Sequence, residues 1–175
     1  LVMWMAAGFT MLEAGLVQKK DVSEIVTKNL GLFSIACVMY LVCGFALMYP
    51  ADPLFAIAGG LDDAGEAISY GIFPAIATSW GLSTDMPREE IGMANGMDYS
   101  QQADFFFQVV FVATAMSIVS GAVAGRMKLI PFFIFTVILT AFIYPVQGYW
   151  NWGGGFLSVL GYSDYAGSGT VHLLG

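Results

Sequence analysis

The twenty residues from Asn29 to Met48 constrain the fold more than any other part of the chain, because none of them is charged. An apolar run of about eighteen residues or more with few charges is long enough to cross the hydrocarbon core of a bilayer as a helix. The composition agrees: 58% of the residues are hydrophobic and 11% are charged, whereas soluble domains have about 25% charged residues. We therefore predict an all-α integral membrane protein.

Apolar runs elsewhere predict the other helices, which we place at 1–17, 22–48, 101–125, 129–150 and from 164 to 175 onward. The first is short for a membrane span, and the last stops soon after it starts. We therefore expect the sequence to be an interior piece of a longer protein, with about four and a half transmembrane helices. In 129–150, Pro131 suits the first turn, and Pro145 is predicted to kink or end the helix.

Residues 49–100 differ from the rest and are predicted to form a loop. This range contains one basic residue, Arg88, and eight acidic residues: Asp52, Asp62, Asp63, Glu66, Asp85, Glu89, Glu90 and Asp98. The apolar pieces at 54–61 and 68–82 are short or interrupted by Gly and Pro, so we expect interfacial or loop helices rather than spans.

Basic residues predict the orientation. Lys19 and Lys20 lie between the first two helices, and Arg126 and Lys128 lie between the third and fourth. The positive-inside rule places both turns in the cytoplasm. The acidic loop and the segment from Trp152 to Asp164 are then external.

His172 is the only histidine of the chain, and an ionisable residue inside a membrane is usually functional or paired. The alternative is a hydrogen-bonded residue of helix packing. Asp164 lies eight residues earlier, where it is suited either to cap a helix N-terminus or to act as a ligand. Glu13 lies near the cytoplasmic Lys19, so we expect it to snorkel or to bond another helix.

Phe107 and Phe111 are four residues apart, and therefore share one face of a helix. Core packing is one interpretation. The other is that these rings and Trp152 offer π faces to a small cation.

Several classes of function find no support. No nucleophile–base pair, HExxH motif, Walker loop or dinucleotide fingerprint occurs in the sequence, so we predict no enzyme activity and no cofactor. Cys37 and Cys43 suit helix packing, and no Cys/His cluster predicts a metal site. Six basic residues argue against nucleic-acid binding.

Four blocks of sequence resemble the Amt/Rh ammonium transporter family, on its Amt branch. They are Met11-Leu12-Glu13-Ala14-Gly15-Leu16, Phe107-Gln108 with Phe111, Trp152-Gly153-Gly154-Gly155, and Asp164-Tyr165-Ala166-Gly167 leading to His172. The spacing of the last two blocks matches the family signature: twelve positions from Trp152 to Asp164 and eight more to His172.

The resemblance implies an eleven-helix bundle of two inverted halves, assembled as a homotrimer in the plasma or inner membrane. Phe107 and Trp152 would recruit ammonium, Phe111 would belong to a gate, Asp164 would support the site, and His172 would line the pore. The implied substrates are ammonium and ammonia, with methylammonium as a candidate analogue and a PII-type regulator as a candidate partner of the full-length protein.

Three other functions remain open from the sequence. The same bundle fused to a cytoplasmic signalling domain would be an ammonium sensor. A structural membrane subunit would use His172 for packing only, and an Rh-type gas channel would be a near relative.

Overall fold

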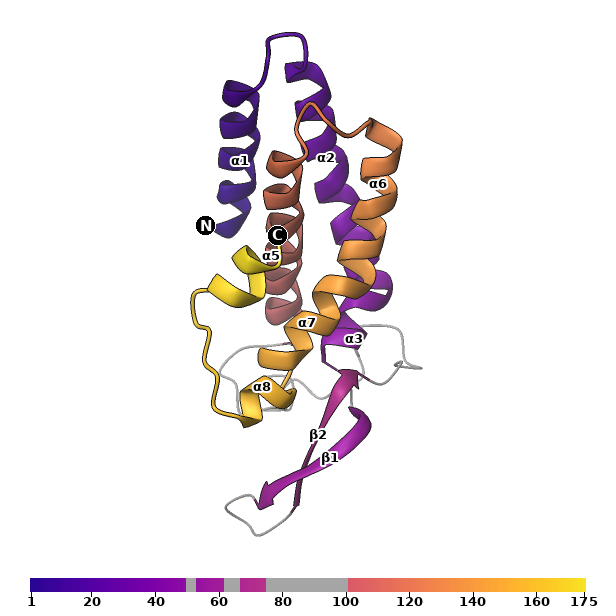
Figure 1. Ribbon diagram of the computed structural model, residues 1–175, viewed down its shortest axis with the longest axis vertical. Coiled ribbons are helices and arrows are strands. Elements are labelled where there is room, and N and C mark those ends of the chain that lie inside the picture. The colour runs from indigo at the N-terminus through magenta and orange to yellow at the C-terminus, as the bar shows by residue number, and fades with distance from the viewer. Residues whose placement is uncertain (50–52, 62–66, 75–100) are drawn as a thin grey trace.

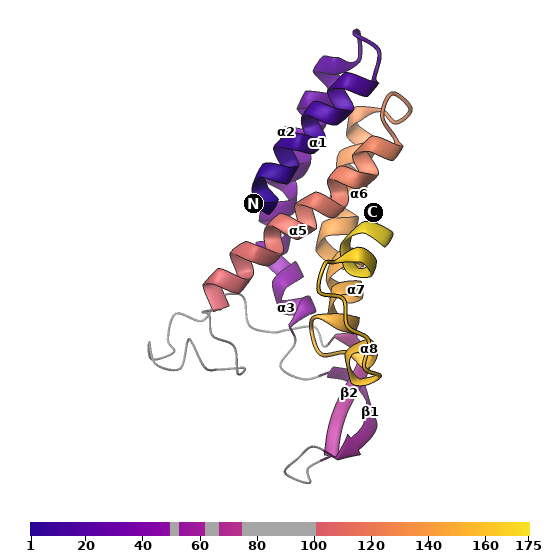
Figure 2. The same cartoon turned by 90° about the vertical axis from the view of Figure 1, so that its left-hand side faces the viewer.

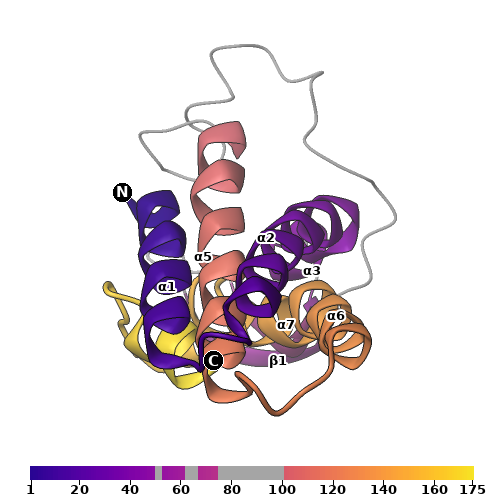
Figure 3. The ribbon, with the colours of Figure 1, turned by 90° about the horizontal axis from the view of Figure 1, so that it is seen from above.

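The computed structural model describes residues 1–49, 53–61, 67–74 and 101–175, and shows a helical bundle with a β-hairpin at one end (Figure 1). Helix α1 spans Val2–Leu16, and α2 begins at Val22. Helix α5, Gln101–Ala122, packs against both of them. Viewed along the bundle, α5 lies between α1 and α2 (Figure 3).

Three helical stretches in the described residues are long and apolar enough to cross a membrane: Val22–Met48, Ala103–Ala122 and Leu129–Val159. Helix α1 is apolar but shorter, at 15 residues. The expectation of a multi-pass helical membrane protein is therefore confirmed.

Two of these stretches contain a turn of π-helix. In the first, α2 ends at Met39, π-helix η1 spans Tyr40–Gly44, and α3 spans Phe45–Met48. In the other, α6 spans Leu129–Ile138, η2 Leu139–Ile143 and α7 Tyr144–Asn151. The two π turns pack against each other.

Pro145 does not end its helix, which was one of its two predicted effects. It lies where η2 joins α7 inside one continuous helical stretch, so its missing N–H leaves a carbonyl of the preceding turn without its usual donor. The carbonyl four residues earlier, on Ala141, accepts a weak bond from Cys43 Sγ at 3.7 Å. The neighbouring helix thus supplies a partner that proline cannot.

The expectation of interfacial or loop helices after Met48 is wrong where the structure can test it. Pro53–Leu61 and Ala67–Pro74 are antiparallel strands β1 and β2, with Leu54 opposite Phe73 and Ile57 opposite Tyr70. Short apolar runs do not distinguish strand from helix. Here Gly59 and Gly60 disfavour a helix, and β-branched and aromatic residues in β2 favour a strand. Residues 75–82 and the acids Asp52, Asp62, Asp63, Glu66, Asp85, Glu89, Glu90 and Asp98 lie outside the described residues.

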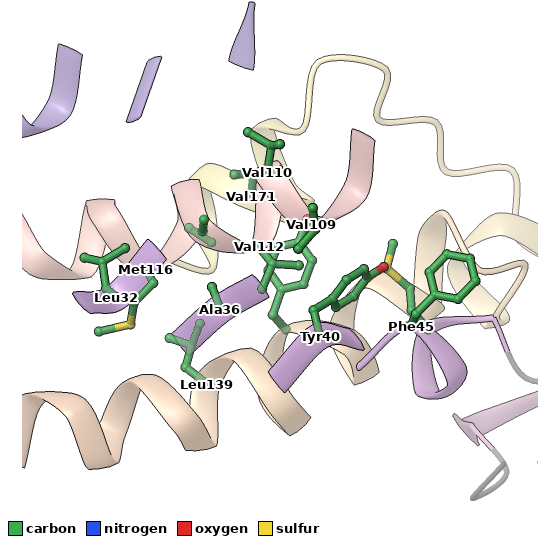
Figure 4. Close-up of a cluster of buried hydrophobic side chains, with 14 of the residues drawn as sticks. Leu32, Ala36, Tyr40, Phe45, Val109, Val110, Val112, Met116, Leu139 and Val171 are labelled. Carbon is green, nitrogen blue, oxygen red and sulfur yellow. The ribbon is translucent and has the colours of Figure 1, made fainter. Parts of the chain in front are cut away.

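Helices α2, α5 and α6 and the π turns share one hydrophobic core (Figure 4). Its buried side chains include Leu32, Ala36, Tyr40, Val112, Met116, Leu139 and Val171. Val171 belongs to the third π-helix, η3, Ser168–Leu173. The core therefore fixes this C-terminal segment against α5, beside which it lies in Figure 2.

Glu13 makes the helix–helix hydrogen bond that was one of its two predicted roles. Its carboxylate accepts bonds from Ser120 Oγ of α5 at 2.7 Å and from Asn29 Nδ2 of α2 at 3.0 Å. These bonds join α1 to both neighbours.

Candidate functional site

Three aromatic rings form a continuous cluster at one end of α5. Phe107 and Phe111 meet at 4.8 Å between centroids and 65° between planes, and Phe111 meets Trp152 at 5.7 Å and 66°. Phe111 and Trp152 are half-buried against the core. The side chain of Phe107 is 54% exposed in the described part of the chain. Packing in the core therefore accounts for the inner two rings but not for Phe107.

Trp152 is held in place by a tight turn of glycines. A Cβ on Gly153 would lie 2.0 Å from the carbonyl oxygen of Met48, so only glycine fits there. Gly154 has a backbone φ of +77°, which residues other than glycine rarely adopt. The indole N–H of Trp152 then donates to the backbone oxygen of Asp164 at 2.8 Å.

Asp164 caps the last helical segment with its carboxylate. Oδ1 accepts the N–H of Ser168 at 2.8 Å, and Oδ2 accepts those of Gly169 at 2.9 Å and Thr170 at 2.8 Å. The side chain is 8% exposed. Burial acts to raise the pKa of Asp164, but the bonds from Thr170, Ser168 and Gly169 together outweigh it, and the pKa is lowered.

The helix predicted to start at Asp164 begins four residues later, at Ser168. Gly167, with a φ of +75°, turns the chain before the first helical residue. The carboxylate can therefore reach the free N–H groups from outside the helix. The capping role was one of the two alternatives open from the sequence, and the geometry provides it.

Two polar residues of α7 that we did not select from the sequence also hold this segment. Gln147 Nε2 donates to the oxygen of Gly169 at 3.3 Å, and Asn151 Nδ2 donates to Thr170 Oγ1 at 3.3 Å. They are four residues apart and so share one helix face. Two amides at that spacing on an apolar helix were the signal that could have identified them.

Three polar side chains form a second group near the start of α5. Gln108 Nε2 donates to Tyr49 Oη at 2.9 Å, and Asp104, also buried, receives bonds from both. These side chains lie in α5 and just after α3. The sequence did not predict this polar group.

His172 lies in η3, and its backbone N–H bonds the oxygen of Gly167 at 3.0 Å. Its side chain is exposed among the described residues. The structure thus brings Phe107, Phe111, Trp152 and Asp164 together through direct contacts, and connects His172 to them through the helix that Asp164 caps. In the described ranges, no group of three His, Cys, Asp or Glu side chains could hold a metal ion.

Comparison with known proteins gives one consistent result. The model of a family described as the Ammonium Transporter Family matches residues 1–175. A putative ammonium transporter of Synechocystis sp. is 37% identical over 179 residues, which are 100% of this chain and 34% of that protein. The ammonium transporter Amt2 of Archaeoglobus fulgidus is 37% identical over 185 residues, with the same coverage.

A solved structure titled Sensor Amt Protein superposes with a TM-score of 0.69 at 30% sequence identity. The match covers 98% of this chain and 38% of that one. The chain spans about a third of the length of the curated relatives that it matches.

Proposed function

The chain belongs to the ammonium transporter family, and from that premise we propose that it forms part of a pathway that carries ammonium or ammonia across a membrane for nitrogen uptake. The observation that carries the proposal is the unbroken series of contacts from Phe107 through Phe111 and Trp152 to Asp164. The two phenylalanines of α5 and the pair Trp152 and Asp164 come from two separate parts of the sequence.

The rings attract the cation. Ammonium above the face of Trp152 or Phe107 gains about 0.5–2 kcal/mol from the ring quadrupole, which concentrates it without trapping it. Phe111 packs between these two rings and acts as the gate beneath them.

Entry of an unpaired cation into an apolar pore is costly. Passing the proton to a relay and moving ammonia separately avoids most of that cost. His172 is the relay group, since neutral imidazole has one donor and one acceptor and can hand a proton onward. Asp164 supports the arrangement by holding both the indole of Trp152 and the helix of His172.

The remaining parts of the proposal concern the complete protein. It is a homotrimer in the plasma or inner membrane, transports methylammonium as an analogue, and is regulated by a PII-type protein. Sequence similarity to transporters over the whole of this chain supports the substrate.

An ammonium sensor is the second candidate, favoured by the similarity to the structure titled Sensor Amt Protein. The same recruitment site would then report ammonium to a cytoplasmic signalling domain. A signalling domain in the complete protein, together with absent uptake, would decide for the sensor.

His172→Ala in the complete protein, reconstituted in liposomes, tests the relay. We expect the ammonium-driven current per inserted protein to be abolished or altered, because alanine cannot relay a proton, while neutral ammonia still passes. Leu173→Ala is the matched control, since Leu173 is an exposed neighbour in the same segment. A normal current in His172→Ala would show that His172 only packs, and transport would then have to proceed without it.

A further inference from the structure

Glu13 lies in the bundle at a distance from the aromatic site, and the proposed function assigns it no task. Its side chain is 4% exposed, between α1, α2 and α5. Its partner Ser120 follows Phe111 by nine residues in α5, or about 13.5 Å along the helix axis. The aromatic cluster and the carboxyl group of Glu13 therefore contact opposite halves of α5.

The hydrogen bonds to this carboxyl group are unevenly distributed. Ser120 Oγ and Asn29 Nδ2 both donate to Oε2, at 2.7 and 3.0 Å. Oε1 is buried and has no hydrogen-bond partner. A buried carboxylate needs donors to both of its oxygens, whereas a carboxylic acid needs donors only to its carbonyl oxygen and an acceptor for its hydroxyl group.

Asn29 shows the complementary gap. Its two amide hydrogens are both used, since Nδ2 donates to Glu13 Oε2 and, at 3.2 Å, to the oxygen of Ile25. This fixes which way the amide faces. Asn29 is 5% exposed, and its Oδ1 is buried and accepts no hydrogen bond. The two orphaned atoms, Glu13 Oε1 and Asn29 Oδ1, are both acceptors.

The charged groups near Glu13 do not fill this gap. Lys28 is the cation that acts on Glu13, but its ammonium donates to the oxygen of Met127 and pairs with Glu24 at 2.9 Å. The same ammonium lies 5.5 Å from the ring centre of Phe132. Lys28 is therefore paired with Glu24 rather than with Glu13. The partner that α5 supplies to Glu13 is the neutral Ser120.

We propose that Glu13 is a proton-binding site, which carries its proton on Oε1 and donates it to Asn29 Oδ1. One proton, taken from water, then satisfies both orphaned atoms. The carboxylic acid and the amide pair through two parallel bonds, Oε1–H to Oδ1 and Nδ2–H to Oε2. The protein holds no extra charge there while the proton is bound.

Release of that proton to water would leave both acceptor oxygens without a donor and place a negative charge between α1, α2 and α5. Proton binding at Glu13 is therefore linked to the contact of α1 with α2 and α5. This site does not depend on the aromatic cluster or on His172, so failure of the transport proposal would not remove it.

Infrared spectroscopy of the complete protein tests the proposal, because a protonated carboxyl absorbs apart from a carboxylate. We expect a protonated-carboxyl band at neutral pH that shifts in heavy water and is lost in Glu13→Gln. Ser120→Ala should move the band without removing it, since Ser120 donates to the carbonyl oxygen of the acid. Glu24→Gln is the matched control and should leave the band unchanged.

The absence of the band from the wild-type protein at neutral pH would overturn the proposal, and so would a band that Glu13→Gln leaves at its full wild-type intensity. Thermal unfolding gives a second measure. Glutamine offers the same donor and acceptor as the neutral acid, so Glu13→Gln should unfold at the wild-type temperature. Glu13→Gln that unfolds well below wild type, with no loss of a band, would indicate a carboxylate.

Discussion

Replacing Asp164 by asparagine tests whether its carboxylate holds the site together. Two oxygens receive three backbone N–H groups, with two of them on Oδ2. Asparagine has one acceptor oxygen, so at best it keeps the two bonds at Oδ2 and loses the bond from Ser168. A hydrogen bond to a charged group contributes about 1.5–3 kcal/mol. We expect at least that loss, since the two remaining bonds also become neutral.

The assay is hydrogen exchange of the segment 168–173 in the complete protein. A loss of about 1.5–3 kcal/mol lowers protection of these amides roughly 10- to 150-fold, at 1.36 kcal/mol per factor of ten. Asp21→Asn is the matched control: Asp21 stands at the N-terminus of α2 and makes no capping bond through its side chain. Equal effects of the two substitutions would refute the capping argument.

The pH dependence gives a second check on Asp164. Its pKa is lowered in the folded protein, so its carboxylate contributes stability fully above the ordinary pKa of aspartate, about 3.9. That contribution is lost as the pH falls through the lowered pKa. The difference in protection between wild type and Asp164→Asn should therefore be constant at neutral pH and shrink only in strong acid. A difference that disappears near neutrality would contradict the lowered pKa.

Three further predictions concern topology, recruitment and the turn before the last helix. Cysteine at Ser69 should react with an impermeant thiol reagent on intact cells and cysteine at Lys128 should not, in a cysteine-free background; the reverse pattern would invert the orientation. Trp152→Leu should weaken uptake roughly 2- to 30-fold at limiting ammonium, for about 0.5–2 kcal/mol of cation–π attraction; unchanged uptake at normal expression would leave Trp152 as an interfacial anchor. Gly167→Ala should destabilise the protein more than Gly154→Ala does in thermal unfolding. Both have positive φ, but only at Gly167 does the new Cβ come within 2.9 Å of another side chain. Equal losses would show that backbone strain alone, about 1–2 kcal/mol, governs both.

The sequence predicts best what depends on neighbours along the chain. The uncharged run from Asn29 to Met48 predicts a membrane-spanning helix, and the spacing of Phe107 and Phe111 predicts rings that meet, because helix geometry alone determines both. The strands at Pro53–Leu61 and Ala67–Pro74 could not be predicted in this way, because a short apolar run suits a strand as well as a helix.

Partners from distant parts of the chain were harder to predict. Glu13 could be expected to bond another helix, but Ser120 lies 107 residues away and is one of many small polar residues. Asp164 could be predicted to cap a helix. The helix begins at Ser168 rather than at Asp164, because the chain turns at Gly167 with a positive φ. The bonds of Gln147 and Asn151 appear only once α7 packs beside η3.

The paired π turns set a rule for insertions and deletions. A π turn holds one more residue than an α turn does, so removing one residue from Tyr40–Gly44 would convert η1 into an ordinary α turn. Phe45 and Met48, which are buried, would keep facing the core, whereas removing one residue from an α turn would rotate all that follows by about 100°. Because η1 lies against η2, and Gly44 fits closely beside Pro145, conversion of one π turn to an α turn would change the surface against which the other packs. Relatives that lack the extra residue at 40–44 should therefore also lack the one at 139–143.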